Sequence, residues 1–447
     1  MKTFKKMKDS ITLTAILLLG FGTVKAQTEL SLNIAVQHAL KYKAEVQKAS
    51  LDVENANYKI EEVRANVLPQ INAAGGLTYN AKLQQMALDM GGKTQVIRMG
   101  TPWSTNAAIQ LDQQLFNMSV FQGLKAARST KEFYMLNADL TEEQIIEKVA
   151  NSYYEVYKTK SQIETLNKTV QNTTRVRNVI ESLEKNGLAK KIDLDRMNVS
   201  LNNLSSSKVQ LENALKLQEN ALKYLIGMEI NEPITLPENT FQIKPEILLE
   251  ETFNVNNRTE IKLLKKQGAL LKLNKSSIEA ARYPSLGLTA NYGYMSMGDQ
   301  LPYFAGPEQG VNGSGFSAIS LNLRVPIFSG FATRSKIKQA DIEIRKHEID
   351  LNDTKLALNL AAENAKTQLT NALLTLNSQS SNQQLSKQVL NNVENNYKNG
   401  LASLTDLLDA ENAHVNAQNN YTAALLDYKL AEVQLKKAKG TLEEYSK

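Results

Sequence analysis

Cysteine is absent from the 447-residue chain, which excludes disulfide bonds, thiolate metal sites and lipid attachment at an N-terminal cysteine. Proline is scarce, with nine residues in all, and none lies within residues 117–186 or 329–399. Because proline is the residue that most strongly interrupts a helix, both segments can be helical from end to end. At about 1.5 Å per residue, each gives a helix on the order of 100 Å long. We therefore expect two helices far longer than an ordinary globular domain requires.

The sequence also lacks a strong excess of either charge. The first 26 residues hold five of the 52 lysines and arginines and one of the 46 acidic residues, so residues 27–447 carry 47 basic and 45 acidic side chains. A nucleic-acid-binding protein would concentrate basic residues on one face. The balance of charge therefore predicts no nucleic-acid partner.

The first 26 residues have the pattern of a secretory signal peptide. Lysines up to Lys8 precede an apolar run from Ile11 to Phe21, and Val24-Lys25-Ala26 has the small-residue spacing of a cleavage site. The apolar run is too short to span a membrane as a helix, and no stop-transfer pattern follows, which disfavours an uncleaved anchor. We expect residues 1–26 to be removed and the protein to be exported.

The rest of the chain contains an internal repeat. Three pairs of segments match in the same order at offsets of 215, 212 and 213 residues: 68–69 with 283–284, 109–116 with 321–328, and 186–189 with 399–402. Matched landmarks in one order indicate a structural unit used twice, over 27–240 and 241–447. Each repeat predicts helix, strand, long loop, strand, very long helix, tight turn and helix.

Each very long helix ends at an Asn-Gly-Leu turn, at 186–188 and at 399–401, where glycine can adopt the left-handed conformation that stops a helix. The chain then returns along a second helix, so each repeat contains a long antiparallel hairpin. The last helix has a seam of alternating four- and three-residue spacing: Ala410, His414, Ala417, Tyr421, Ala424, Tyr428, Ala431, Leu435 and Ala438. The same register in the first repeat gives Met197, Leu201, Leu204, Lys208, Leu211, Leu215, Gln218, Leu222 and Leu225. This sustained spacing predicts coiled-coil packing, whereas an ordinary amphipathic helix would drift from it.

Four segments alternate between apolar and small or polar side chains, at about 69–80, 105–116, 284–295 and 315–328. Aromatic residues gather near their ends: Tyr79, Trp103, Phe116, Tyr283, Tyr294, Phe316 and Phe328. Alternation over about ten residues with aromatic ends is typical of transmembrane β-strands. A soluble sheet with one wet face is the alternative, because it would alternate in the same way.

Four strands cannot close a barrel, and open strand edges are not tolerated in lipid. Since the smallest bacterial barrels have about eight strands, the chain must form an oligomer, with two or three copies as the open alternatives. Residues 80–103 and 295–313 are glycine-rich and are expected to be long outer loops. Residues 227–247 contain three prolines and predict a linker that wraps around the middle of the helices.

Four motifs carry a family resemblance: residues 30–40, Leu225-Ile226-Gly227, the segment 397–410 (Tyr-Lys-Asn-Gly-Leu-Ala-Ser-Leu-Thr-Asp-Leu-Leu-Asp-Ala) and Gly440-Thr441-Leu442. In this order they resemble the TolC-like outer-membrane efflux protein family. The resemblance implies an α+β membrane protein that is a homotrimer. Four transmembrane β-strands per chain would complete a 12-stranded β-barrel, and long antiparallel coiled-coil helices would form a periplasmic α-barrel.

The resemblance also implies a passive channel, the exit duct of a tripartite efflux or type I secretion system. Its partners would be a periplasmic adaptor (membrane fusion) protein, an inner-membrane RND or ABC transporter and outer-membrane lipid. The sequence does not specify the cargo, the pump class or the adaptor.

Asp406 and Asp409 are the first candidate site residues. They lie three positions apart, on one side of the helix that follows Gly400. The family has aspartates at these positions around the periplasmic entrance, where a ring of them would favour cations. The alternative is that acidic residues in a first helical turn stabilise the helix dipole.

The resemblance adds Asp193 and Tyr397 to this entrance, at positions that hold the family's channel closed. Ala402 stands where the family has a gate arginine. The arginine-centred bridge therefore cannot form, and Lys190 or Lys191 on the other hairpin is the candidate substitute.

Two further sets of candidate site residues follow from their positions in the repeats. Gly187, Leu188, Gly400 and Leu401 lie at the hairpin tips, where the family meets its adaptor, although each also serves as a helix-stopping turn. Asp112 and Arg324 occupy equivalent places on two strands and are expected in the barrel lumen, either as a pair or as separate hydrated residues.

No pattern predicts catalysis, a cofactor or a metal site, so the chain is not expected to be an enzyme. Gly91-Gly92-Lys93 lacks the spacing of a phosphate-binding loop. The three histidines, His38, His347 and His414, are far apart and predict packing or surface roles. The competing interpretation is a periplasmic coiled-coil scaffold or adaptor, which would explain the hairpins but not the four amphipathic strands.

Overall fold

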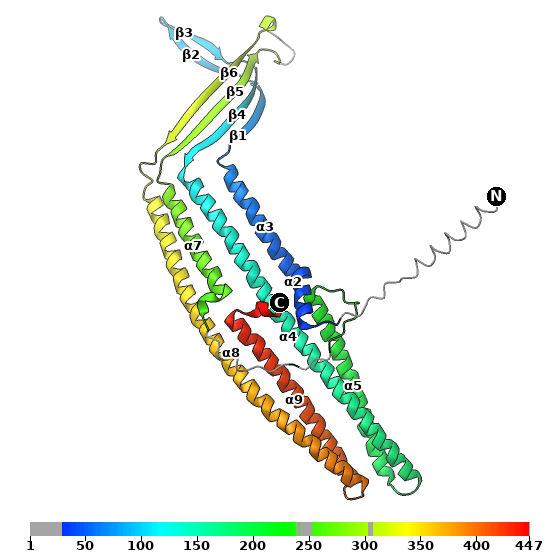
Figure 1. Cartoon of the computed structure of the whole chain (residues 1–447). Coiled ribbons are helices and arrows are strands. Elements are labelled where there is room, and N and C mark those ends of the chain that lie inside the picture. The colour runs from blue at the N-terminus through cyan, green and yellow to red at the C-terminus, as the bar shows by residue number, and fades with distance from the viewer. Residues whose placement is uncertain (1–28, 238–240, 242–252, 303–306, 447) are drawn as a thin grey trace, which may run out of the picture. The chain divides into compact units, whose positions relative to one another are not determined.

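The computed structural model describes residues 29–237, 241, 253–302 and 307–446 (Figure 1). The expected signal peptide lies outside this range, as do positions 238–240 and 242–247 of the expected linker. The chain divides into two compact units, and each takes segments from both repeats. Unit 1 comprises Met1–Lys48, Asp139–Thr259 and Lys355–Lys447, and unit 2 comprises Ala49–Ala138 and Glu260–Thr354.

Unit 2 contains a four-stranded antiparallel sheet in the order β1-β4-β5-β6 (Figure 1). The strands are β1 (Gln70–Tyr79), β4 (Trp103–Asn117), β5 (Ser285–Gly298) and β6 (Val311–Arg324). The two repeats meet where β4 pairs with β5, with Ile109 opposite Tyr292. In the single chain the apolar face is uncovered, so that Tyr292 is 71% and Ile319 is 81% exposed. The sheet therefore has a large apolar surface and two edge strands, β1 and β6.

The structure differs from the expected strands and loops at three places. The expected outer loop at 295–313 is shorter, because β5 continues to Gly298 and β6 begins at Val311. The last strand ends at Arg324 rather than near residue 328, because Pro326 cannot donate a strand hydrogen bond and restricts the residue before it. The expected loop after β1 contains a second antiparallel sheet, formed by β2 (Gln84–Met90) and β3 (Lys93–Met99). Gly91 and Gly92 join these strands at φ values of 66° and 86°, which suits a two-residue hairpin turn.

Four helices contribute residues to both units: α3 (Ala44–Ala65), α4 (Met118–Lys185), α7 (Thr259–Ala280) and α8 (Ala332–Lys398). The two longest, α4 with 68 residues and α8 with 67, coincide with the proline-free segments. In unit 2, α7 and α8 are joined by Lys275, whose Nζ lies 2.8 Å from Asp341 Oδ1. His347 adds a 2.7 Å hydrogen bond between its Nε2 and the Leu264 carbonyl oxygen.

Unit 1 contains α2 (Leu32–Tyr42) and the returning helices α5 (Lys191–Ile226) and α9 (Leu404–Lys439). The largest core cluster joins α2, α4, α5 and α9 through residues such as Val36, Val149, Leu222 and Val433. A second cluster packs one side of α9 on α8: Ala362, Ala365, Leu369, Leu376, Ala424, Tyr428, Ala431, Leu435 and Ala438. Every member of both predicted seams is buried or half-buried. The coiled-coil prediction is therefore confirmed.

Short segments complete unit 1. The described part of the linker lies against the helices, because Lys160 Nζ donates to the Leu236 carbonyl oxygen at 2.8 Å and the ring of Phe241 lies 4.6 Å from that of Tyr157. The 3-10 helices are η1 (Val255–Asn257) and η3 (Leu442–Tyr445) in this unit and η2 (Pro307–Gln309) in unit 2. Asn33 Nδ2 donates to the Tyr445 carbonyl oxygen at 3.3 Å, which ties the chain end to α2.

Candidate functional site at the hairpin tips

The two hairpin tips in unit 1 have the same backbone geometry. Gly187 and Gly400 both adopt φ of 72°, and the amides of Leu188 and Leu401 both donate at 2.8 Å to the carbonyl oxygen five residues earlier. This is the left-handed ending that glycine favours because it has no Cβ. The leucines that follow are 75% and 78% exposed. Each tip therefore presents one apolar side chain on a rigid turn.

Asp406 is held locally at the start of α9. Its Oδ2 accepts from the Ser403 amide at 2.8 Å and from Ser403 Oγ at 2.7 Å, while the Asp406 amide donates back to Ser403 Oγ at 3.2 Å. This reciprocal capping box satisfies amides at a helix start that would otherwise lack partners. The hydrogen bonds from Ser403 lower the pKa of Asp406, so its carboxylate stays charged. Asp409 is exposed one turn further along the helix.

Tyr397 lies among side chains from both hairpins. It is half-buried and packs against two small clusters, one formed by Ile180, Met197 and Leu404 and the other by Leu390, Leu407 and Ala410. Burial raises the pKa of Tyr397, and the charge of Asp193 raises it further. The first turn of α5, which contains Asp193, lies at the same cluster, because Leu194 and Tyr397 both pack against it.

A direct hydrogen bond links the hairpins, and sequence reasoning missed it. Arg196 Nη1 on α5 donates to Thr405 Oγ1 on α9 at 3.2 Å. Lys190 and Lys191, the candidates to replace the gate arginine, are exposed, and the described part of the chain offers no ion pair to either. A signal was available: at the offset of 213 residues, Arg196 corresponds to Asp409, so equivalent tip positions carry opposite charges.

A small cavity lies near the tips between α4, α8 and α9, with a volume of about 150 Å³. Its wall includes Glu411, which is only 7% exposed and whose Oε2 accepts from Thr173 Oγ1 at 3.3 Å. Burial is the main cause that raises the pKa of Glu411, and Glu394 adds to it. Arg175 and Lys398 also line the cavity, so its wall combines charged and apolar side chains.

The two expected lumen residues lie at different levels of the sheet in unit 2. Asp112 accepts hydrogen bonds from Gln110 Nε2 at 2.8 Å and from Thr289 Oγ1 at 3.1 Å. Arg324 is opposite Ser285, which in turn is opposite Asn117 on β4. With a rise of roughly 3.4 Å per residue, Arg324 is far along the strands from Asp112. The two therefore do not pair within one chain.

The described residues hold no candidate for another kind of site. No group of three or more His, Asp or Glu side chains is arranged to hold a metal ion there. Each histidine bonds to a neighbouring helix: His38 to the Ile226 carbonyl, His347 to the Leu264 carbonyl and His414 to Ser386 Oγ. Within the same described ranges, every helix is too short or too polar to cross a membrane.

Comparison with known proteins gives one consistent family. The model of the outer membrane efflux protein family matches residues 35–228 and 274–441. The chain is 23% identical to outer membrane protein TolC of Escherichia coli (strain K12) over 450 residues, covering 97% of this chain and 86% of TolC. It is 22% identical over 421 residues to the probable outer membrane lipoprotein SilC of Salmonella typhimurium, covering 91% of this chain and 84% of SilC.

Solved structures show the same fold. The outer membrane protein VceC of Vibrio cholerae superimposes with a TM-score of 0.70 at 18% identity, covering 92% of this chain and 96% of VceC. The open-state MtrE outer membrane channel of Neisseria gonorrhoeae superimposes with a TM-score of 0.71 at 19% identity, covering 93% of this chain and 90% of MtrE. The family match favours the channel interpretation over the periplasmic scaffold. Because the family model matches most of its length, the chain belongs to the outer membrane efflux protein family, as an outer-membrane channel with a periplasmic extension.

Proposed function

We propose that three copies of this chain form the exit duct of a tripartite efflux or type I secretion system. Twelve strands would close a barrel in the outer membrane, and the paired hairpins would form a periplasmic tunnel. The duct would be passive, with an inner-membrane RND or ABC transporter supplying the energy and a periplasmic adaptor connecting the two.

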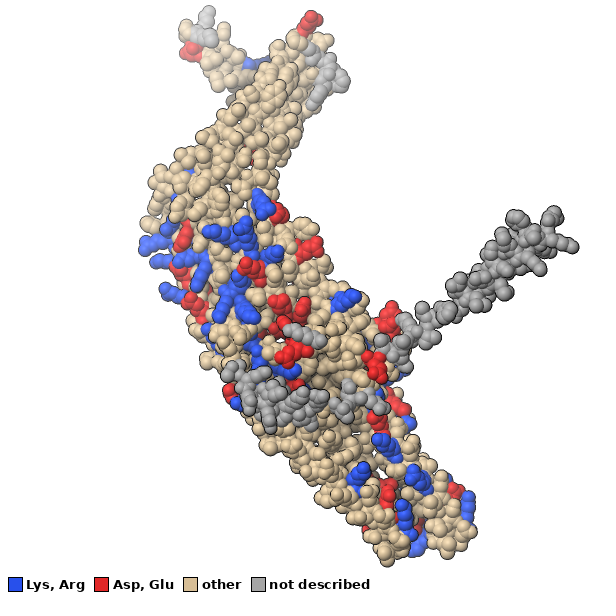
Figure 2. Space-filling view, in the orientation of Figure 1, with Lys and Arg blue, Asp and Glu red and all other residues tan. Residues whose placement is uncertain are grey.

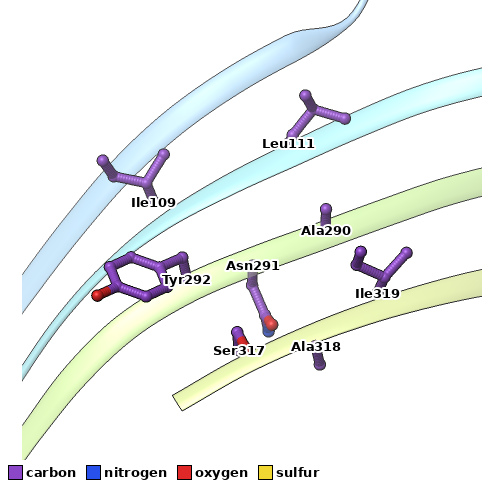
Figure 3. Close-up of a pocket in the computed structure, with 8 residues that line it drawn as sticks. All are labelled: Ile109, Leu111, Ala290, Asn291, Tyr292, Ser317, Ala318 and Ile319. Carbon is purple, nitrogen blue, oxygen red and sulfur yellow. The ribbon is translucent and has the colours of Figure 1, made fainter. Parts of the chain in front are cut away.

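The open sheet of unit 2 is the observation that carries this proposal. One face of the sheet is apolar and exposed in the single chain, and β1 and β6 are edge strands. Unpaired backbone groups at such edges cost several kcal/mol each in lipid. Pairing β6 of one copy with β1 of the next removes both edges and creates a closed barrel. Figure 3 shows part of the exposed face, with Ile109 and Leu111 on β4, Tyr292 on β5 and Ile319 on β6 lining a cavity.

The hairpin tips are proposed as the docking surface for the adaptor. Leu188 and Leu401 stand on rigid glycine turns and are mostly exposed, so docking them requires little ordering of the backbone. The cavity between α4, α8 and α9 lies beside them and adds charged groups that can give specificity.

Asp409 and Asp406 are proposed to line the periplasmic entrance as an acidic ring. Asp406 combines this role with its capping box, because a carboxylate that accepts hydrogen bonds from Ser403 keeps its charge. Three copies would place six carboxylates around one opening and favour cations.

The experiment that tests the duct is conductance across a planar lipid bilayer, using the full-length processed protein. Wild-type protein should give discrete, cation-favouring steps. Asp406→Asn with Asp409→Asn should reduce cation selectivity, because the ring loses its charge. Asp427→Asn removes one charge from an exposed position further along α9; it is the control for each single substitution and should leave selectivity unchanged.

Two results would contradict parts of the proposal. Conductance steps whose ion selectivity is unchanged by the Asp406 and Asp409 substitutions would support the duct and contradict the acidic ring. Absence of conductance, in wild-type protein and also in variants whose hairpin link is broken, would remove the duct itself.

A further inference from the structure

A cleft in unit 2 lies where the sheet meets the helices, and the proposed duct does not use it. It is formed by the end of α7 and by the segment that leads from β6 into the first turn of α8, and its volume is about 340 Å³. Its lining combines two arginines, Arg282 and Arg334, with three large apolar side chains, Ile327, Phe328 and Phe331.

The two arginines are cations without a local counter-charge. Both are exposed, and the described residues offer neither an ion pair. The acidic residues nearest in sequence, Glu279 and Asp341, both interact with Lys275, at 3.8 Å and 2.8 Å. Residues 325–340 contain three basic and no acidic side chains, and Figure 2 shows lysines and arginines gathered over the helix ends next to the sheet. The cleft is therefore ready to receive an anion.

The apolar part of the cleft is unusually exposed and is held in place by the backbone. Ile327 is 94%, Phe328 74% and Phe331 63% exposed, and the two phenylalanine rings meet edge to face with centroids 5.4 Å apart. Phe331 has a φ of 62°, and it is the one non-glycine residue with positive φ in the described chain. A bulky residue adopts this left-handed conformation only at a cost. Such strain is concentrated at functional sites, and here it holds an aromatic ring in the open.

We infer that this cleft binds an anionic phospholipid of the membrane leaflet that faces the periplasm. The guanidinium groups of Arg282 and Arg334 suit a phosphate, which arginine recognises with paired hydrogen bonds. Ile327, Phe328 and Phe331 suit the acyl chains that adjoin it, whereas a soluble anion would leave these side chains in water. The inference rests on the proposed membrane placement of the strands, because aromatic residues at strand ends mark the level of the headgroups.

The test measures lipid retained by the purified full-length protein in detergent, by native mass spectrometry, with phosphatidylglycerol and phosphatidylcholine offered in equal amounts. Wild-type protein should prefer phosphatidylglycerol. Each cation near an anionic lipid surface contributes on the order of fivefold, so Arg282→Gln with Arg334→Gln should reduce that preference by about tenfold to thirtyfold. The matched control is Lys262→Gln with Arg345→Gln, which removes the same charge from exposed positions on α7 and α8 further from the sheet.

A third variant separates lipid binding from stability. Phe331→Gly removes the ring and also relieves the left-handed strain, so it should lower phosphatidylglycerol retention without lowering the melting temperature. If inorganic phosphate displaced all of the retained phosphatidylglycerol, and Phe331→Gly did not change the amount retained, the cleft would be an anion site and the lipid assignment would be overturned.

The remaining outcomes distinguish this inference from the duct. Protein that conducts in bilayers but shows no phosphatidylglycerol preference, or the same preference in the double arginine variant, would overturn the lipid site alone. Loss of the oligomer in that variant, measured by size, would instead assign the arginines to contacts between copies. Absence of conductance in both the wild type and the variants with a broken hairpin link, together with retention of neither lipid, would overturn both proposals.

Discussion

We expect the hydrogen bond from Arg196 to Thr405, which links the two hairpins of one chain, to stabilise the closed state of the proposed channel. Thr405→Val keeps the shape of the side chain and removes the hydroxyl that accepts from Arg196 Nη1 at 3.2 Å. An exposed hydrogen bond from a charged donor is worth about 0.5–1 kcal/mol. Three copies in the proposed trimer would then stabilise the closed state by about 1.5–3 kcal/mol, which corresponds to roughly a 10- to 150-fold change in the opening equilibrium.

The assay for this prediction is the open probability of single channels in a planar bilayer. Thr405→Val and Arg196→Gln should each raise it, and the double variant should add little to either, because both remove the same interaction. Lys190→Gln removes a positive charge from the same tip and should have no comparable effect. Additive effects of the two substitutions, or an equal effect of Lys190→Gln, would refute the reasoning.

Two further predictions concern stability. Gly400→Ala should lower the free energy of unfolding by about 1 kcal/mol per chain, because alanine is strained at a φ of 72° although open space surrounds the added Cβ. Gly123→Ala, within a helix, should raise the free energy of unfolding by up to about 1 kcal/mol. If urea unfolding showed that both variants lose the same stability, this account would be contradicted. Burial raises the pKa of Glu411 above its ordinary value of 4.5, so the folded state holds this proton more tightly than the unfolded state. The free energy of unfolding should therefore fall as pH rises from about 4.5 through the raised pKa. Glu411→Gln keeps an acceptor for Thr173 and should flatten that fall, as thermal unfolding at several pH values would show; an unchanged pH dependence would exclude Glu411 as the cause.

The sequence alone determined the elements that depend on local rules. The proline-free segments became α4 and α8 because nothing in them interrupts helical hydrogen bonding. Gly187 and Gly400 end those helices because only glycine adopts positive φ at no cost. The 3,4 spacing identified the seam of α9 because a helix of fixed pitch brings those positions to one side. Alternation with a period of two located the strands, because successive side chains of a strand point to opposite faces of the sheet.

The tertiary structure decided what depends on contacts between distant segments. It showed that β4 pairs with β5 across the two repeats and that β6 stops at Arg324. It also joined Arg196 to Thr405, a contact between helices 209 positions apart in the chain that no local pattern specifies. The uncompensated charge of Arg282 and Arg334 was equally invisible in the sequence, because it depends on which carboxylates Lys275 occupies. Local rules fix the conformation of a segment, whereas the partner of a side chain is set by packing of elements that the sequence keeps far apart.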